Sequence, residues 1–135
     1  MSLAPTDRYA TLVHGDFKAM NVMLPPPPGG GAPNDADAPM LIDFASCGVG
    51  LGMTDVAMLL AHSVAPATLA HGGQERLIEG YLAALAARGV RDYARDVAMR
   101  HFHLATVDYA RFVLPWQFYL SGEEAGSLCA TLSSL

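Results

Sequence analysis

A group of polar residues in the first third of the chain has types and spacing that could do chemistry. Residues 14–21 read HGDFKAMN, so Asp16 and Asn21 are five residues apart and Lys18 lies between them. A second acidic residue, Asp43, follows the apolar run MLI. Carboxylate and amide oxygens are the ligands that Mg²⁺ prefers, and a carboxylate can orient a hydroxyl group and accept its proton. This set of residues therefore suits phosphoryl transfer to an alcohol.

The same residues also have a plainer interpretation, in which each of them only shapes a turn. His-Gly-Asp is a common turn sequence, because Gly allows positive φ and Asp can form an Asx-turn. Asp43 could end a strand for the same reason. Four residue types at fixed offsets, with a second apolar run that ends in Asp-Phe, are harder to explain in this way. An unrelated helical domain with a fortuitous motif is a third interpretation.

The stretch HGDFKAMNVML, followed by LIDFASCGVGLGMTDVAMLL, resembles the catalytic loop and metal-binding segment of the protein-kinase-like superfamily. Gly15 stands where protein kinases carry Arg. The pattern is therefore similar to the aminoglycoside phosphotransferase and choline kinase branch, and within it to the ecdysteroid-kinase-like (CHK kinase-like) group. The resemblance covers Thr11 to about Leu60. It implies a small-molecule kinase, a phosphotransferase with ATP as co-substrate, Mg²⁺ as cofactor and an alcohol as acceptor. The alternative is a non-catalytic, truncated or pseudokinase-like fragment that acts as a binding module.

The resemblance implies a role for each polar residue of the site. Asp16 matches the catalytic base, and Lys18 stands where a lysine can neutralise charge on the γ-phosphate. Asn21 and Asp43 match the two metal ligands. A strand-turn-strand arrangement would bring Asp43 alongside the loop that carries the other three residues.

Other residues are expected to support this loop without reacting. His14 is expected to pack and hydrogen-bond within it. Asp55 matches a family residue that braces the catalytic loop from the next helix, whereas its plain interpretation is a helix N-cap. The glycine-rich segment 48–52 is expected to be a flexible turn. It is not read as a phosphate cradle, because the dinucleotide fingerprint has a different spacing and needs a βαβ unit.

The elements that must position these residues give an α+β fold that is mostly α, a kinase-like C-terminal lobe with a short β-hairpin followed by about three helices. Short strands are predicted over 9–13, 21–24 and 40–42, the last of them buried. The second and third would form the hairpin, with the Pro- and Gly-rich segment 25–39 as a flexible loop at its tip. Helices are predicted over 54–63, 74–88, which Gly89 would end, and 92–120.

Four aromatic residues fall on one side of the last predicted helix: Tyr109, Phe112, Trp116 and Tyr119. One interpretation is an aromatic wall for the acceptor, such as a cage for a quaternary ammonium group. The favoured interpretation is packing in the core, so Tyr109 and Trp116 are only weak candidates for substrate binding. The acceptor stays open among choline, a sterol, an aminoglycoside and a sugar amine.

Composition and charge narrow the partners and the location. The formal net charge is −5, the pI is about 5.3 and the sequence holds no basic run, which argues against nucleic-acid binding. The sequence holds no apolar stretch of the roughly 20 residues that span a membrane and no signal-peptide pattern, so a cytoplasmic protein without membrane contact is expected. Cys47 and Cys129 lie far apart and are expected to be buried free thiols.

The length of 135 residues suits one domain. Only 13 residues precede His14, so the resemblance implies a single partial domain over 1–135, a catalytic lobe without the nucleotide lobe. That lobe would supply a Gly-rich loop, a lysine and a glutamate partner. Apolar surface left open in its absence would favour association with another molecule.

Overall fold

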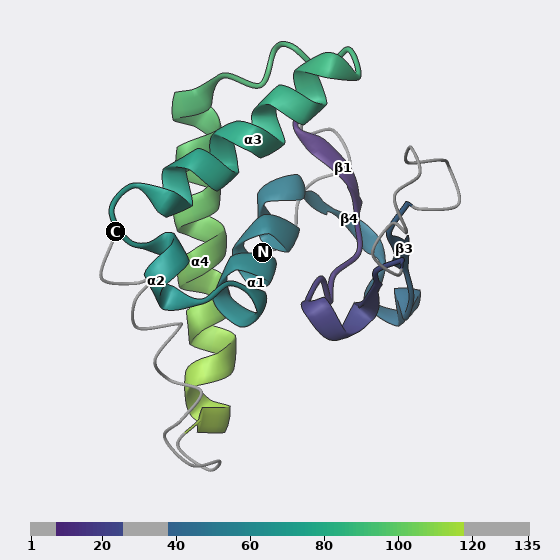
Figure 1. Cartoon of the computed structure of the whole chain (residues 1–135), viewed down its shortest axis with the longest axis vertical. Helices are drawn as coiled ribbons and strands as arrows, with labels where there is room; N and C mark the ends of the chain where they lie inside the picture. The colour runs from purple at the N-terminus through teal and green to yellow at the C-terminus, as the bar shows by residue number, and fades with distance from the viewer. Residues whose placement is uncertain (1–7, 26–37, 118–135) are drawn as a thin grey trace.

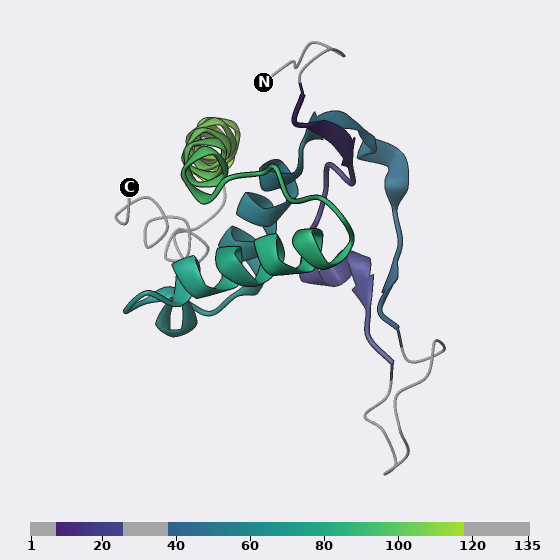
Figure 2. The ribbon, with the colours of Figure 1, turned by 90° about the horizontal axis from the view of Figure 1, so that it is seen from above.

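The computed structural model describes residues 8–25 and 38–117 of the chain. The fold is α+β and mostly helical, as the sequence predicts. Figure 1 shows the helices gathered on one side of the molecule and the strands on the other, and Figure 2 shows the same arrangement from above. Helix α1 (Gly52–Ser63) contacts α4 (Arg95–Gln117) as well as strands β1 (Ala10–Val13) and β4 (Gly48–Leu51). It therefore joins the helical part to the strands.

The pairing of β1 with β4 corrects one expectation. The two strands run antiparallel, with Ala10 opposite Leu51 and Val13 opposite Gly48, so the segment predicted to be a flexible turn is mostly a strand. Backbone hydrogen bonds, which need no particular side chain, form this ladder. A Cβ atom at Gly50 would lie 2.9 Å from Cγ2 of Val13. The glycine therefore leaves room for the valine side chain across the ladder.

The predicted hairpin is confirmed. Strands β2 (Val22–Met23) and β3 (Met40–Leu41) pair antiparallel, with Val22 opposite Leu41 and Met23 opposite Met40. Most of the predicted tip loop, residues 26–37, lies outside the described residues. The strand predicted over 40–42 was expected to be buried. This expectation is wrong, because Met40 is 58% exposed and Ile42 is 38% exposed. Within the described residues the hairpin forms a sheet of only these two strands, so no further strand covers their side chains.

The helices agree with the apolar spacing, with small changes at their ends. Helix α3 spans Gly73–Ala87, and Gly89 follows it with a φ of +95°, as expected of a helix stop. Helix α4 begins at Arg95, three residues later than predicted, and continues through Pro115. Helix α2 (Pro66–Leu69), a single turn that begins with proline, was not predicted. None of the described helices has the length and apolar character needed to cross a membrane.

The hydrophobic core lies where the long helices meet. Met53 of α1, Ile78 of α3 and Phe102 of α4 are each fully buried. Burying a side chain of this kind contributes about 1.5–3 kcal/mol. These contacts fix α1 against the other helices, and α1 is the element from which Asp55 approaches the loop at residues 14–21.

Candidate functional site

The loop at residues 14–21 connects β1 to β2 and is called the HGD loop below. Its second residue, Gly15, has a φ of +78°, and a Cβ atom there would lie only 2.2 Å from the backbone oxygen of Ser46. Both observations require glycine, which alone adopts this conformation without strain and leaves space for the neighbouring backbone. The loop ends in a 3₁₀ turn, η1 (Ala19–Asn21), just before β2.

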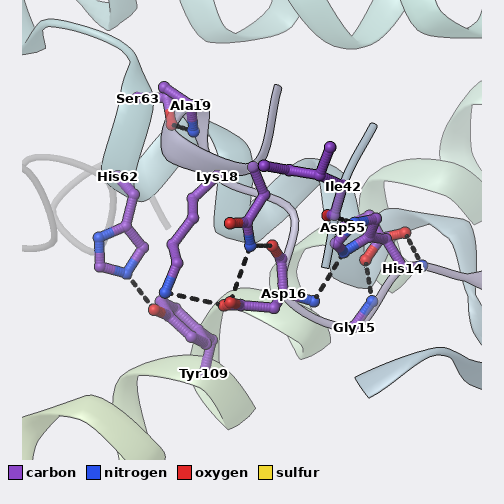
Figure 3. A network of polar contacts seen from close by, with 11 residues as sticks. His14, Gly15, Asp16, Lys18, Ala19, Ile42, Asp55, His62, Ser63 and Tyr109 are labelled. Atoms are coloured by element: carbon purple, nitrogen blue, oxygen red, sulfur yellow. Dashed lines mark hydrogen bonds and ion pairs between the residues drawn. The ribbon is translucent and has the colours of Figure 1, made fainter. Parts of the chain in front are cut away.

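The carboxylate of Asp16 is held by two neighbouring side chains of the same loop. Nζ of Lys18 lies 3.0 Å from Oδ1 of Asp16, and Nδ2 of Asn21 donates to Oδ2 at 2.9 Å. The same Asn21 nitrogen also donates to the backbone oxygen of Asp16 at 2.8 Å. Figure 3 shows Lys18 reaching this carboxylate. The structure thus brings together three of the four residues that the sequence predicts for the chemistry.

These contacts affect how readily Asp16 binds a proton. Burial raises the pKa of the Asp16 carboxyl, but hydrogen bonds from Lys18 and Asn21, with the positive charge of Lys18, outweigh it and leave the pKa below its usual value. The carboxylate is therefore ionised at neutral pH. An ionised carboxylate can accept a hydrogen bond from a hydroxyl group and orient it.

The hairpin brings Asp43 next to the buried Asn21. Ile42 donates its backbone N–H to the backbone oxygen of Asn21 at 3.1 Å, and Asp43 is the following residue. Asp43 is exposed and has a left-handed backbone, with φ +62° and ψ +66°. Aspartate tolerates this region better than most residues, but a non-glycine residue there is uncommon. Such conformations are frequent where a site constrains the backbone.

The donor set fits a magnesium ion that is shared with phosphates. Asn21 donates through its amide nitrogen to Asp16, so its amide oxygen is the atom left to act as a ligand, and Asp43 adds a carboxylate. Mg²⁺ commonly takes one or two protein oxygens and completes its shell with phosphate oxygens and water. Among the described residues, no group of three or more His, Cys, Asp or Glu residues could hold a metal ion. The described residues therefore contain no metal site built only from His, Cys, Asp and Glu side chains.

His14 is buried and uses both ring nitrogens within its surroundings. Its Nε2 contacts the backbone oxygen of Ile42 at 2.9 Å, and because a carbonyl can only accept, Nε2 carries the hydrogen. Nδ1 accepts the backbone N–H of Asp16 at 3.4 Å. The ring also lies against Phe17 and Phe44, with centroid separations of 5.9 and 4.8 Å. These are the contacts expected of a residue that packs within the loop.

Asp55 lies in the first turn of α1 and binds the beginning of the HGD loop. Its Oδ2 accepts the backbone N–H of His14 at 2.7 Å, and its Oδ1 accepts that of Gly15 at 2.9 Å. The N-cap of α1 is Leu51 and has no side-chain cap, so the plain capping interpretation of Asp55 is wrong. The two bonds are the contacts that a bracing role requires. The negative charge of Asp55 adds to burial in raising the pKa of Tyr81 on α3.

Two residues at the end of α1, which were not predicted, make contacts near the HGD loop. Oγ of Ser63 accepts the backbone N–H of Ala19 at 2.7 Å. His62 is hydrogen-bonded to the hydroxyl of Tyr109, and the two rings meet edge to face at 5.4 Å. These partners are 44 and 47 residues apart in the chain. No local pattern could therefore have indicated them.

The aromatic side of α4 differs in part from the expectation of core packing. Tyr109 is half-buried and packs near Ala61 and Ala110, whereas Phe112 is 68% exposed. This exposure shows that core packing is wrong for Phe112. Tyr119 and the side chain of Trp116 lie outside the described residues. Tyr109 is thus the one weak substrate-binding candidate whose surroundings are described.

A cavity of about 230 Å³ lies beside His14 and Asp55. Its other lining residues are mostly apolar: Leu12, Val13, Phe17, Leu41, Phe44 and Cys47. Asp16 does not line it. Cys47 is exposed as a free thiol, which contradicts the expectation that it is buried, and Cys129 lies outside the described residues.

The HGD loop thus combines an ionised carboxylate with the lysine and the amide that hold it. The model of the phosphotransferase enzyme family matches residues 2–98 of the chain, so the chain belongs to this family. The matched region includes the HGD loop, the hairpin and helices α1 to α3, and it ends in the first turns of α4. No curated protein and no solved structure gives a significant match. The ecdysteroid-kinase-like group remains a prediction within the confirmed superfamily.

Proposed function

We propose that this chain carries the catalytic lobe of a small-molecule kinase that transfers the γ-phosphate of ATP to an alcohol. The observation that carries the proposal is the Asp16 carboxylate, with one oxygen on Lys18 at 3.0 Å and the other on Asn21 at 2.9 Å. Membership of the phosphotransferase enzyme family supports the same reaction class. The separate nucleotide lobe and acceptor binding by Tyr109 or Trp116 remain predictions.

Asp16 would act on the acceptor hydroxyl. Because its pKa is lowered, the carboxylate is ready to accept a hydrogen bond from that hydroxyl and align its oxygen with the γ-phosphorus. The new bond joins this oxygen to the γ-phosphorus, the bond from the γ-phosphorus to the β-phosphate oxygen breaks, and the hydroxyl proton passes to Asp16. The products are a phosphate ester and ADP.

The other polar residues would balance the charge of the phosphates. Asn21 and Asp43 would hold Mg²⁺, which when bound shields the phosphate oxygens. Lys18 contacts Asp16 at 3.0 Å, and its flexible side chain could move its ammonium group to the γ-phosphate. The position of the lysine two residues after the base allows both contacts.

The test is phosphoryl transfer from labelled ATP, in the presence of Mg²⁺, to a panel of amino alcohols, aminoglycosides and sugars. Asp16→Asn and Asp43→Asn should each lower turnover by at least about 10²-fold, with the fold unchanged by circular dichroism. Asp96→Asn is the matched control, because this exposed carboxylate of α4 pairs with Arg100 at 3.5 Å, on the surface of its own helix. It should leave turnover unchanged.

Calorimetry with ATP and Mg²⁺ on the same proteins distinguishes the two hypotheses. A kinase should bind the nucleotide, and Asp43→Asn should weaken that binding because it removes a metal ligand. Undiminished turnover in either site variant would overturn the proposed roles. A folded chain that neither binds ATP nor transfers phosphate would instead favour the non-catalytic binding module.

A further inference from the structure

The second half of the HGD loop is the short helix η1, which begins without a side-chain cap. Ala19 is the first residue of η1, and the first N–H groups of a helix have no partner within it. Lys18 occupies the N-cap position with the extended backbone usual there, φ −137° and ψ +162°, and its side chain makes no capping bond. The backbone bonds of η1 run from the N–H of Asn21 to the oxygen of Lys18 at 2.9 Å and from the N–H of Val22 to the oxygen of Ala19, so neither uses the N–H of Ala19. The N–H of Ala19 therefore needs a partner from elsewhere.

Ser63 supplies that partner from the end of α1. Its Oγ lies 2.7 Å from the backbone nitrogen of Ala19, and Figure 3 shows the two groups meeting near Lys18. Asp55 binds the other end of the loop from the first turn of the same helix. Asp55 and Ser63 are eight residues apart, which corresponds to about 12 Å along a helix axis. One rigid helix thus holds the loop at two separate points.

The end of α1 is fixed in turn. His62, next to Ser63, bonds to the hydroxyl of Tyr109 on α4, and Ala61 is buried against the same helix. The hydroxyl of Ser63 is therefore presented from a position that two helices define. A group held in this way can fix a loop more closely than a side chain on another loop.

We propose that Ser63 is a positioning residue, which sets the placement of Lys18 and Asn21 relative to Asp16 by holding the N–H of Ala19. The catalytic part of this inference rests on the proposed phosphotransferase function. In this proposal Ser63 acts on the site through the loop backbone, by its bond to Ala19. The competing interpretation is a surface serine whose bond water can replace without effect, because Ala19 is exposed.

Amide hydrogen exchange, measured by NMR on the whole chain, tests the contact without requiring turnover. Ser63→Ala should speed exchange at Ala19 about three- to tenfold, the change expected when one hydrogen bond is lost. His14 and Gly15, held by Asp55, should exchange as before. Ser63→Thr keeps the hydroxyl and should restore slow exchange. Thr68→Ala, which removes a hydroxyl from the exposed surface of α2, is the control. Unchanged exchange at Ala19 in Ser63→Ala would overturn the proposal.

Kinetics then test the consequence for the reaction. Ser63→Ala should lower kcat about three- to tenfold with KM for ATP unchanged, and Ser63→Thr should recover most of the loss. An equal loss in Thr68→Ala, or an unchanged kcat in Ser63→Ala, would contradict a positioning role. If the chain together with a nucleotide lobe shows no phosphoryl transfer, the proposed function fails, and the exchange experiment alone decides whether Ser63 holds the loop.

Discussion

The HGD loop and Asp43 supply the two halves of the proposed site, and they are held in different ways. Both carboxylate oxygens of Asp16 are bonded to side chains, and the loop backbone is bonded to Asp55 and Ser63. Asp43 is exposed, and within the described residues its carboxylate makes no hydrogen bond or ion pair. Its position is set by the backbone alone, through the bond of Ile42 to Asn21.

The difference suits what each half would do. A base must already be aligned when the acceptor arrives, since a misplaced group loses much of the rate advantage of proximity. A metal ligand must instead keep an oxygen open to the ion. Substitutions in the HGD loop and at its supports should therefore affect stability more than substitutions at Asp43.

Replacing the residue that holds the beginning of the loop should have the largest effect on stability. Asp55→Asn leaves one side-chain oxygen for two backbone N–H groups and removes the charge that strengthens both bonds. The free energy of unfolding, measured with urea, should fall by about 3 kcal/mol. Asp96→Asn, an exposed carboxylate also in the first turn of a helix, should change it by less than about 0.5 kcal/mol. Equal effects of the two substitutions would show that the bonds from Asp55 to the HGD loop do not stabilise the fold.

Gly15→Ala should come next in size. The new Cβ would meet the backbone oxygen of Ser46, at 2.2 Å in the present geometry, and the φ of +78° is unfavourable for alanine. The left-handed conformation alone costs about 1–2 kcal/mol, so unfolding should become easier by about 2 kcal/mol. Gly48→Ala is the matched control, because φ there is not positive and no atom lies within 4 Å of the added Cβ. A Gly15→Ala protein as stable as the control would show that the loop adapts freely.

The elements that the sequence predicted well carry their signals locally. The apolar spacing of α1 and α3 depends only on neighbouring residues, and so does the strand-loop-strand pattern of the hairpin. The polar residues of the HGD loop likewise lie within one short segment. A single stretch of sequence was therefore enough to predict that they lie together.

What the sequence could not indicate depends on contacts between distant segments. Gly48–Leu51 becomes a strand because β1 lies opposite to it, and nothing in a glycine-rich segment favours a strand by itself. The contact of Ser63 with Ala19 depends on how α1 packs against the strands. The exposure of Met40 depends on the absence of a covering layer in the described structure. Each of these outcomes is decided by tertiary packing and not by local preference.

The titration of Asp16 tests whether Lys18 and Asn21 hold its carboxylate in the ionised form. Its folded pKa lies below the ordinary value of 3.8, so its bonds contribute stability that is fully present above that pH. The contribution is lost as the pH falls through the folded pKa. The Asp16 carboxyl carbon, followed by NMR from about pH 7 to about pH 2, should show a midpoint below 3.8. Lys18→Met should raise this midpoint, whereas Arg100→Met, which removes an exposed cation on α4, should not. A wild-type midpoint above 3.8 would contradict the arrangement.

The smallest effect on stability is expected at Asp43. Two substitutions there separate the strain of the backbone from the role of the carboxylate. Asp43→Gly and Asp43→Ala both remove the carboxylate, so both should abolish phosphoryl transfer if Asp43 holds the metal. They differ in the backbone, because glycine adopts a φ of +62° freely and alanine does not. The glycine variant should be more stable than the alanine variant by about 1 kcal/mol in urea unfolding. Equal stability would mean that the left-handed conformation of residue 43 is relaxed once the carboxylate is gone. In that case the left-handed conformation would be caused by the aspartate side chain and not by the surrounding turn.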